Sequence, residues 1–110
     1  MPRKSRKIKL AEAIPFEKPG FSGRRYVQAG EALGFTALMV EANGQHPEKQ
    51  LTDTTRCYLV LSGSGTFRVD DRFITVTADD LIVVQPDSPY SYEGTMRLFE
   101  FNVSPNNSFE

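Results

Sequence analysis

The sequence predicts an all-β protein, either a sandwich or a closed barrel, and three observations support this. After Phe35 no window shows a sustained apolar period of 3.6 residues, so long helices are not expected. From Arg56 onward, short apolar segments alternate with turn-forming residues. The 110 residues are 39% hydrophobic and 25% charged, which is typical of one globular domain with one core. A succession of short strands indicates a sheet that closes on itself, because closure removes exposed edges.

The elements follow in order along the chain. Residues 10 to 34 form an irregular lead-in, because proline and glycine interrupt any regular pattern there. Strands are expected at 26 to 29, 35 to 41, 56 to 61, 65 to 70, 72 to 77, 81 to 84, 90 to 93 and 96 to 103. Turns or loops are expected at 42 to 44, 46 to 55, 62 to 65, 70 to 71 and 85 to 89.

Cysteine usage and hydropathy limit the class of protein. Cys57 is the only cysteine, so an internal disulfide and a zinc site of four cysteines are excluded. Its apolar neighbours favour a small buried hydrophobe over a reactive thiol. No stretch approaches the roughly 18 apolar residues that cross a bilayer, and no apolar core follows the N-terminal charges. We therefore expect no membrane span, no secretory signal and a cytoplasmic location.

Basic residues crowd the start of the chain. Five of the 13 Lys and Arg residues lie within residues 1 to 9, with no acid among them. The remaining eight face 14 Asp and Glu residues, a net charge of −6 for the body. Such a body will not attract nucleic acid by its overall field. We expect residues 1 to 9 to be a solvated, flexible arm and residues 10 to 110 to be a single domain.

Between Gly44 and Gly94 the chain resembles the cupin superfamily, whose two motifs lie on a double-stranded β-helix, the jelly-roll barrel. Gly44 and Gly63 occupy the ends of the first motif at the family spacing, and residues 58 to 65 are similar to its strand and turn. Residues 80 to 84 and 86 to 90 are similar to the second motif in their order of residue types. The resemblance implies a cupin barrel, and small cupins often pair into homodimers by sheet contact and N-terminal strand exchange.

The positions at which cupins hold their metal depart from the family pattern. In register, the family's three histidines and one glutamate fall on Gln50, Thr52, Arg56 and Tyr90. None of these is a good ligand for a divalent transition metal, and Arg56 brings a positive charge where a carboxylate would neutralise a cation. We therefore expect neither a metal nor another cofactor at this site.

Strand alternation predicts which side chains face the barrel interior. If Arg56 points inward, Tyr58 and Val60 do as well, while their neighbours pack on the other face. A buried guanidinium needs an acid, carbonyl groups or an anionic ligand. The ligand-binding candidates are Gln50, Thr52, Arg56, Tyr58, Tyr90 and Tyr92. The alternative is a filled cavity in which Arg56 pairs with an acid, the candidates being Asp53, Glu93 and Glu41.

Catalysis has two candidates. His46, the only histidine, follows the first motif glycine in what is expected to be an exposed loop. Tyr90 beside Arg56 could act as an acid, since a nearby positive charge favours the phenolate. The alternation of Phe67, Val69, Phe99, Phe101 and Val103 is expected to form barrel core or a dimer face.

Three functions remain open. The first is a metal-independent cupin that binds a small polar or anionic ligand, a carboxylate, phosphate or sugar, as a sensor or accessory protein. The second is a metal-free isomerase, epimerase or lyase acting on a sugar or small carboxylate. The third is a structural module with a filled barrel. A homodimer is the expected assembly, with neither nucleic acid nor a membrane as a partner.

Overall fold

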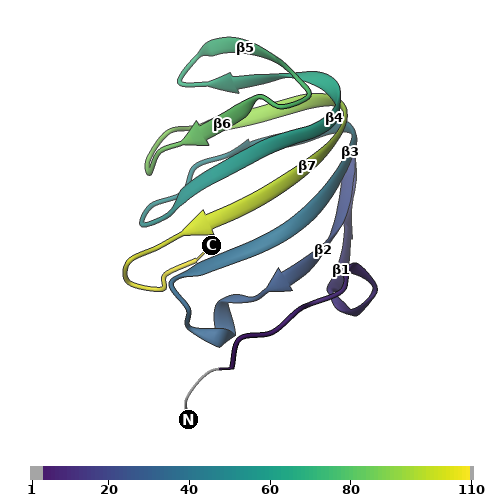
Figure 1. The fold of residues 1–110 in the computed structure, drawn as a ribbon. Helices are drawn as coiled ribbons and strands as arrows, with labels where there is room; N and C mark the ends of the chain where they lie inside the picture. Colours follow the sequence, from purple (N-terminus) through teal and green to yellow (C-terminus); the bar gives the residue numbers. More distant parts are fainter. Residues whose placement is uncertain (1–3, 110) are drawn as a thin grey trace.

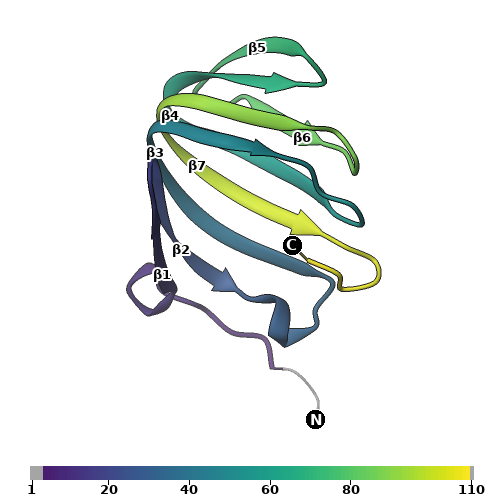
Figure 2. The same cartoon turned by 180° about the vertical axis from the view of Figure 1, so that it is seen from behind.

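The computed structural model describes residues 4–109, and most of that range is β-strand (Figures 1 and 2). The strands are β1 (Ile14–Lys18), β2 (Phe21–Val27), β3 (Phe35–Lys49), β4 (Thr55–Val69), β5 (Arg72–Thr77), β6 (Leu81–Val84) and β7 (Tyr90–Val103). Two single-turn 3-10 helices, η1 (Leu10–Glu12) and η2 (Ala29–Glu31), are the helical segments of this range. Within it, no helix has the length and apolar character needed to span a membrane. The predicted all-β class is confirmed.

The strands form one antiparallel sheet in the order β1-β2-β3-β7-β4-β5, and β6 also pairs with β4. Strand β4 pairs with a different neighbouring strand in each of its two parts. Its first part, from Arg56 to Leu59, pairs with β6, whereas its second part, from Ser64 to Val69, pairs with β5. Strands β3, β7 and β4 are adjacent, and Figures 1 and 2 show them curving round one side of the molecule. The sheet therefore folds back on itself and encloses an interior, as the cupin barrel predicts.

Three glycines in register lie where the long strands bend. Gly94 of β7 pairs with Gly44 of β3 on one side and with Gly65 of β4 on the other. Gly94 has a φ of +146°, and a Cβ there would lie 2.5 Å from the carbonyl oxygen of Ser64. Only glycine tolerates such a close approach of two backbones. These residues let each long strand pass through the bend without ending.

Several predicted boundaries agree with the structure and others are wrong. The strands at 72 to 77 and 81 to 84 are confirmed, and so is the two-residue turn at Asp70 and Asp71, both of which have positive φ. The turns expected at 42 to 44 and 62 to 65 are wrong, because β3 and β4 run through them. The glycines there bend strands instead of ending them, and a bulge lies between Val60 and Ser62.

The N-terminal segment lies against η2. Residues 4 to 9 have no helix or strand, and Arg6 forms an ion pair with Glu31 of η2. Residues 1 to 3, the rest of the predicted basic arm, lie outside the described residues. The contact ties part of the arm to the barrel, and the division of the chain at residue 9 stays a prediction.

Apolar and aromatic side chains fill the interior. Burying them supplies the main driving force of folding, at about 25 cal/mol per Å² of apolar surface. The largest fully buried ones include Tyr58, Tyr90, Phe67, Leu98 and Val60. Phe67 and Val69 belong to this core. This agrees with the first of the two predictions for them, barrel core or dimer face.

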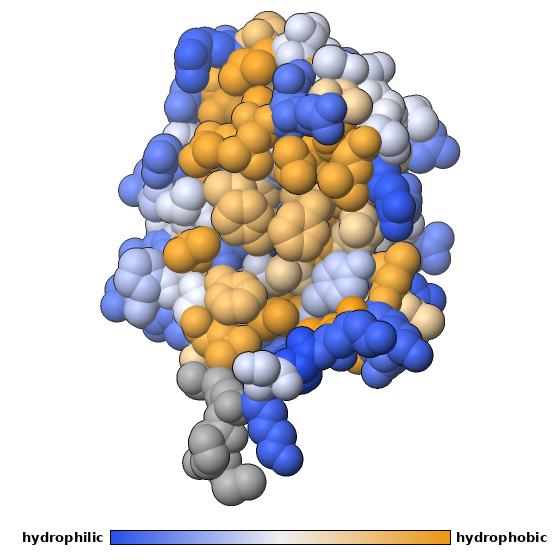
Figure 3. Space-filling model, viewed as in Figure 1, coloured by the Kyte–Doolittle hydropathy of each residue, from blue (hydrophilic) through white to orange (hydrophobic). Residues whose placement is uncertain are grey.

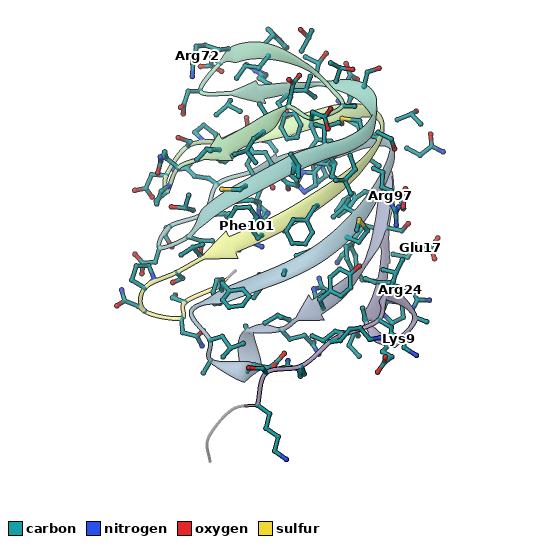
Figure 4. All side chains as sticks on the ribbon, in the orientation of Figure 1. Lys9, Glu17, Arg24, Arg72, Arg97 and Phe101 are labelled. Carbon is teal, nitrogen blue, oxygen red and sulfur yellow. The ribbon has the colours of Figure 1, made fainter. Side chains whose placement is uncertain are left out.

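The opposite face of the same strands is also apolar. Two rows cross four strands in register, and they consist of Leu81, Leu59, Phe99 and Met39 in one row and Val83, Cys57, Phe101 and Ala37 in the other. Figure 3 shows this apolar surface, and Figure 4 labels Phe101 on β7 in the same view. Leu81 and Val83 are 53% and 46% exposed. We call these two rows the outer apolar face, and Cys57 is buried within it, as predicted.

Candidate functional site

Arg56 lies inside the barrel on β4. The side chains of Arg56, Tyr58 and Val60 are 8%, 0% and 0% exposed, in agreement with the predicted alternation. The cross-strand register places Arg56 beside Asn102 of β7, which in turn lies beside Thr36 of β3. A row of polar side chains therefore crosses the inner surface near the ends of three strands.

Hydrogen bonds join this row to two tyrosines, Tyr58 on β4 and Tyr90 at the start of β7. Arg56 donates from Nε to Oδ1 of Asn102 at 2.6 Å and from a terminal nitrogen to the hydroxyl of Tyr90 at 2.6 Å. The hydroxyls of Tyr90 and Tyr58 lie 2.7 Å apart. Asn102 donates from Nδ2 to Thr36 at 3.0 Å and to Glu100 at 2.9 Å. We call these six residues the inner polar network.

Glu100 is the acid that compensates the charge of Arg56. Its Oε2 lies 3.4 Å from Nε of Arg56, and both side chains are about 10% exposed. The expected partners are wrong: Glu41 pairs with Arg97 on the surface, and Asp53 and Glu93 are exposed. Glu100 and Asn102 were missed because β7 was expected to break between residues 93 and 96. In one continuous strand, alternation from Tyr90 and Tyr92 leads directly to both.

The electrostatics keep Arg56 charged. Burial lowers the pKa of Arg56, but Glu100 and the neighbouring tyrosines raise it, and the net direction is upward. A charged guanidinium and a carboxylate therefore lie side by side in a largely buried site. Their charges cancel, so this part of the interior offers both hydrogen-bond donors and acceptors without a net charge.

The position expected for His46 is wrong. It is only 6% exposed and lies within β3, because that strand continues past Gly44 to Lys49. Its ring stacks on Tyr92 and Tyr90, with centroids 4.8 Å and 5.4 Å away, and lies 4.7 Å from the ring of Phe21. Alternation with the inward residues of β3 was the signal for this placement, but the polar stretch that follows Gly44 concealed it.

The protonation of His46 follows from its contacts. Nδ1 lies 2.7 Å from the carbonyl oxygen of Pro47, and a carbonyl can only accept, so Nδ1 carries the hydrogen. Burial lowers the pKa of His46, so the ring is neutral near pH 7 and Nε2 has a free lone pair. Among the described residues, the only fully enclosed side-chain nitrogen or oxygen without a hydrogen bond is Nε of Arg97. Nε2 of His46 therefore retains contact with open space and can act as an acceptor.

The three inner tyrosines remain protonated. Burial raises the pKa of Tyr58, Tyr90 and Tyr92. For Tyr90 the effect of burial exceeds the opposite effect of Arg56, so the net direction of its pKa is upward. These hydroxyls act as hydrogen-bond donors and weak acids.

Gln50 and Thr52 do not join the other candidates. Both side chains are exposed, because the segment between β3 and β4 turns Leu51 inward, where it is 1% exposed. The carbonyl of Leu51 accepts a hydrogen bond from the backbone N–H of Asp87, which fixes that orientation. Residues 4–109 contain no group of three or more His, Cys, Asp or Glu side chains that could hold a metal ion.

Two pockets border the inner residues. A pocket of about 340 Å³ is lined by Thr36, Arg56, Glu100 and Asn102 of the network, together with Arg25, Leu38 and Phe109 among others. A second pocket of about 860 Å³ is lined by His46, Phe21, the last residues of β3, Arg68 and Ser91 among others. Tyr90 stacks on His46 and bonds to Arg56, so it connects residues that border the two pockets. One pocket is polar, and the other is bordered by the aromatic rings of His46 and Phe21.

Comparison with solved structures places this fold among cupins. Pac13, described as a unique nucleoside dehydratase, superposes with a TM-score of 0.81 and 24% identity over 92% of this chain and 83% of Pac13. Streptomyces Pac13 variants with a replaced tyrosine or histidine were solved with uridine. The cupin domain of Schizosaccharomyces pombe Cnp3 superposes with a TM-score of 0.76 and 16% identity, over 89% of this chain and 73% of that one. At these identities the likeness establishes the fold.

Comparison by sequence gives a family and one distant similarity. Desmoglein-2 of Mus musculus is 30% identical over 94 residues, which cover 77% of this chain. The chain spans only 8% of the length of desmoglein-2, so that similarity says nothing about activity here. Residues 33–109 match the model of the AraC-like ligand binding domain, a span that contains the whole inner polar network. The chain therefore belongs to the AraC-like ligand binding domain family of the cupin superfamily, and its expected partner is a small-molecule ligand.

Proposed function

We propose that this barrel binds a small, polar, hydroxyl-rich molecule against the inner polar network, without a metal. The observation that carries the proposal is the Arg56–Glu100 pair at the wall of a pocket of about 340 Å³. Pockets of this size suit small ligands, and a few convergent polar groups fix their orientation. A ligand hydroxyl can donate to Glu100 and accept from Arg56 at the same time.

Arg56 and Glu100 have hydrogen-bonding groups that the protein does not use. A guanidinium has five N–H groups, and Arg56 uses two of them, in its bonds to Asn102 and Tyr90. Glu100 accepts from Asn102 through Oε2, which leaves Oε1 for a ligand. Because Glu100 neutralises Arg56, a neutral ligand suits the deep part of the pocket better than an anion does. This shifts the expectation from an anion held by Arg56 toward a polyol.

A nucleoside is the ligand class to test first. The rings of His46 and Phe21 border the pocket of about 860 Å³, and Tyr90 connects His46 to the polar network. A nucleoside has one flat aromatic ring and one hydroxyl-rich sugar, which suit an aromatic surface and a polar surface. The likeness to Pac13, whose variants were solved with uridine, supports the same choice. The role would be that of a sensor or an accessory protein.

The experiment is a thermal-shift and calorimetric screen of uridine, other nucleosides, sugars and small carboxylates. We expect a nucleoside to raise the melting temperature, because a ligand that binds only the folded state stabilises it. Thr36→Val should weaken binding, since it removes one hydroxyl from the pocket wall. Thr75→Val is the matched control, because Thr75 is exposed on β5 and lines neither of the two pockets described above. Equal binding by both variants, or no binding by any polyol, would reject the proposal.

A second candidate function is a metal-free dehydratase, and the placement of His46 favours it. A neutral imidazole with a free Nε2 is a suitable base. The nearby tyrosine hydroxyls stay protonated, because burial raises their pKa, and they can donate a proton as weak acids. In such an elimination, Nε2 removes a proton from a carbon next to a carbonyl. The hydroxyl on the adjacent carbon leaves as water after taking a proton from a tyrosine, and a carbon–carbon double bond forms.

Turnover separates this candidate from simple binding. An enzyme should convert a carbonyl-bearing nucleoside to its unsaturated product, visible as a mass loss of one water. His46→Gln should abolish conversion while retaining binding. A wild-type protein that binds such a compound and never changes it is a binding protein only.

We also propose that the protein forms a homodimer through the outer apolar face. The two rows of this face cross β6, β4, β7 and β3, and Figure 3 shows them as a continuous apolar surface. Monomeric proteins rarely expose contiguous apolar surfaces of this kind. A second copy presents the same surface and can cover it by a twofold, self-complementary contact.

A further inference from the structure

Arg25 is a second guanidinium on the wall of the same pocket. It pairs in register with Leu38, whose side chain belongs to the core, so the side chain of Arg25 lies on the inner face of β2. It lines the pocket of about 340 Å³ together with Arg56 and Glu100. The preceding residue, Arg24, pairs with Met39 and faces the opposite side, where Figure 4 labels it near β1 and β2.

No acid compensates the charge of Arg25. Among residues 4–109 its guanidinium makes no ion pair and no hydrogen bond, and it lies over the ring of Phe16, 4.3 Å from the ring centroid. Arg24, by contrast, donates to the backbone carbonyl of Ala13. A guanidinium that lies over an aromatic ring keeps its edge N–H groups free for a planar, bidentate partner.

The charges that line the pocket do not balance. Among residues 4–109, two arginines and one glutamate line it, a net charge of +1 for the described part of the chain. Since Glu100 is engaged with Arg56, the excess positive charge lies at Arg25. Arg25 is half-buried, so water screens it less than it screens a surface arginine.

The register sets the spacing between the charged groups. Arg25 lies beside Leu38, and Leu38 lies beside Glu100, so two strand spacings separate Arg25 from Glu100. At about 4.8 Å per spacing this is roughly 10 Å at the backbone. A small molecule can therefore contact the polar network with one end and Arg25 with the other.

We propose that the ligand of this pocket carries an anionic oxyacid group, a phosphate or a carboxylate, that Arg25 binds in bidentate fashion. The inference rests on the proposed function, because the hydroxyl-rich part of the same ligand contacts the inner polar network. It differs from an anion held by Arg56, whose charge Glu100 already neutralises. The ligand class is thus an anionic derivative of a polyol, such as a nucleoside monophosphate.

The test compares uridine with uridine 5′-monophosphate by isothermal titration calorimetry. We expect the phosphate to tighten binding by about tenfold in the wild type, the effect of one charged hydrogen-bonding contact. Higher salt should reduce that preference, because ions screen the contact. Arg25→Gln should abolish the preference, so that the ratio of the two dissociation constants falls to about one. Arg24→Gln is the matched control, since it removes the same charge one residue away on the other face.

Each outcome has a distinct meaning. A preference that survives in Arg25→Gln, or falls equally in Arg24→Gln, would overturn the inference and leave the proposed function intact. If uridine does not bind at all, the nucleoside proposal fails, and inorganic phosphate becomes the probe. Phosphate should then raise the melting temperature of the wild type and of Arg24→Gln but not that of Arg25→Gln. That result would support an anion site at Arg25 without the nucleoside proposal. Phosphate stabilisation that is absent, or independent of Arg25, would reject it.

Discussion

Arg56 and Glu100 lie side by side on neighbouring strands inside the barrel, with 3.4 Å between Nε and Oε2. An isolated charge at either position would be costly, because burial removes the water that would otherwise solvate it. Asn102 bonds to both members, and Tyr90 bonds to Arg56, so the pair is held on several sides. The barrel therefore contains a charged pair that is satisfied by the protein and still open to a pocket.

The first prediction concerns the stability of this pair. Glu100→Leu should destabilise the protein by about 3–5 kcal/mol, because it leaves the Arg56 charge buried without a counter-charge. The double variant Arg56→Met/Glu100→Leu should recover most of that loss. Urea unfolding of the three proteins measures the difference.

Arg97 and Glu41 provide the matched control for that series. They form an ion pair whose side chains are 41% and 56% exposed. Arg97→Met should cost less than about 1 kcal/mol, since exposed ion pairs contribute little. A Glu100→Leu loss as small as that of Arg97→Met would show that the inner pair is well hydrated.

The second prediction concerns pH. Burial lowers the pKa of His46 in the folded state below the ordinary value of 6.5, so the unfolded chain binds a proton more readily. The contribution of His46 to the free energy of unfolding should therefore be constant above pH 6.5. It should decrease as the pH drops from 6.5 to the pKa of His46 in the folded state. Unfolding midpoints measured between pH 5 and pH 8 test this.

His46 is the only histidine, so one substitution isolates the effect. His46→Phe keeps a ring between the tyrosines but cannot be protonated. Its stability should not show the decline in this pH window. An unchanged decline in the variant would assign the pH dependence to carboxyl groups elsewhere.

The third prediction concerns metals. EDTA should not lower the melting temperature, and divalent metals should not raise it. The reason is chemical: in the register that the family resemblance implies, the ligand positions fall on Arg56, Tyr90 and the exposed Gln50 and Thr52, none of which is a good ligand for a divalent transition metal. A metal that raises the melting temperature and is removed by EDTA would reveal a site built from other residues.

The fourth prediction concerns assembly. Leu81→Lys combined with Val83→Lys places two charges in the outer apolar face and should convert a dimer to a monomer, as measured by light scattering. Phe73→Lys is the control, because Phe73 is 75% exposed on β5, away from that face. A wild-type protein that is already monomeric, or a dimer that resists the double variant, would reject the proposed interface.

The sequence predicted the fold class well because alternation and turn chemistry act over short ranges. Strand β5 and the turn at Asp70 and Asp71 matched the structure, since two residues of positive φ join paired strands there. The long strands were not predictable in the same way. Gly44 and Gly94 are typical turn residues, and only the paired register shows that they bend strands that continue.

The residues of the site could be predicted only within segments whose extent as one strand was predicted correctly. Arg56, Tyr58 and Tyr90 meet in the structure, and alternation within short segments was enough to group them. Glu100 was not predicted, because its inward orientation follows from counting every second residue along β7 only if β7 is one continuous strand. Gln50 and Thr52 were assigned from the register of a family motif, whereas the buried Leu51 determines how this segment faces.

The measurement that tests the central proposal most directly is a proton NMR titration of the single His46 imidazole with uridine. His46 lies in the interior beside Tyr90, which bonds to Arg56, so its ring signals report on ligand in the barrel. We predict saturable shifts of the His46 signals and of the Arg56 Nε–H signal, with one common dissociation constant. Signals that stay unchanged up to millimolar uridine and millimolar uridine 5′-monophosphate would contradict a nucleoside-binding barrel.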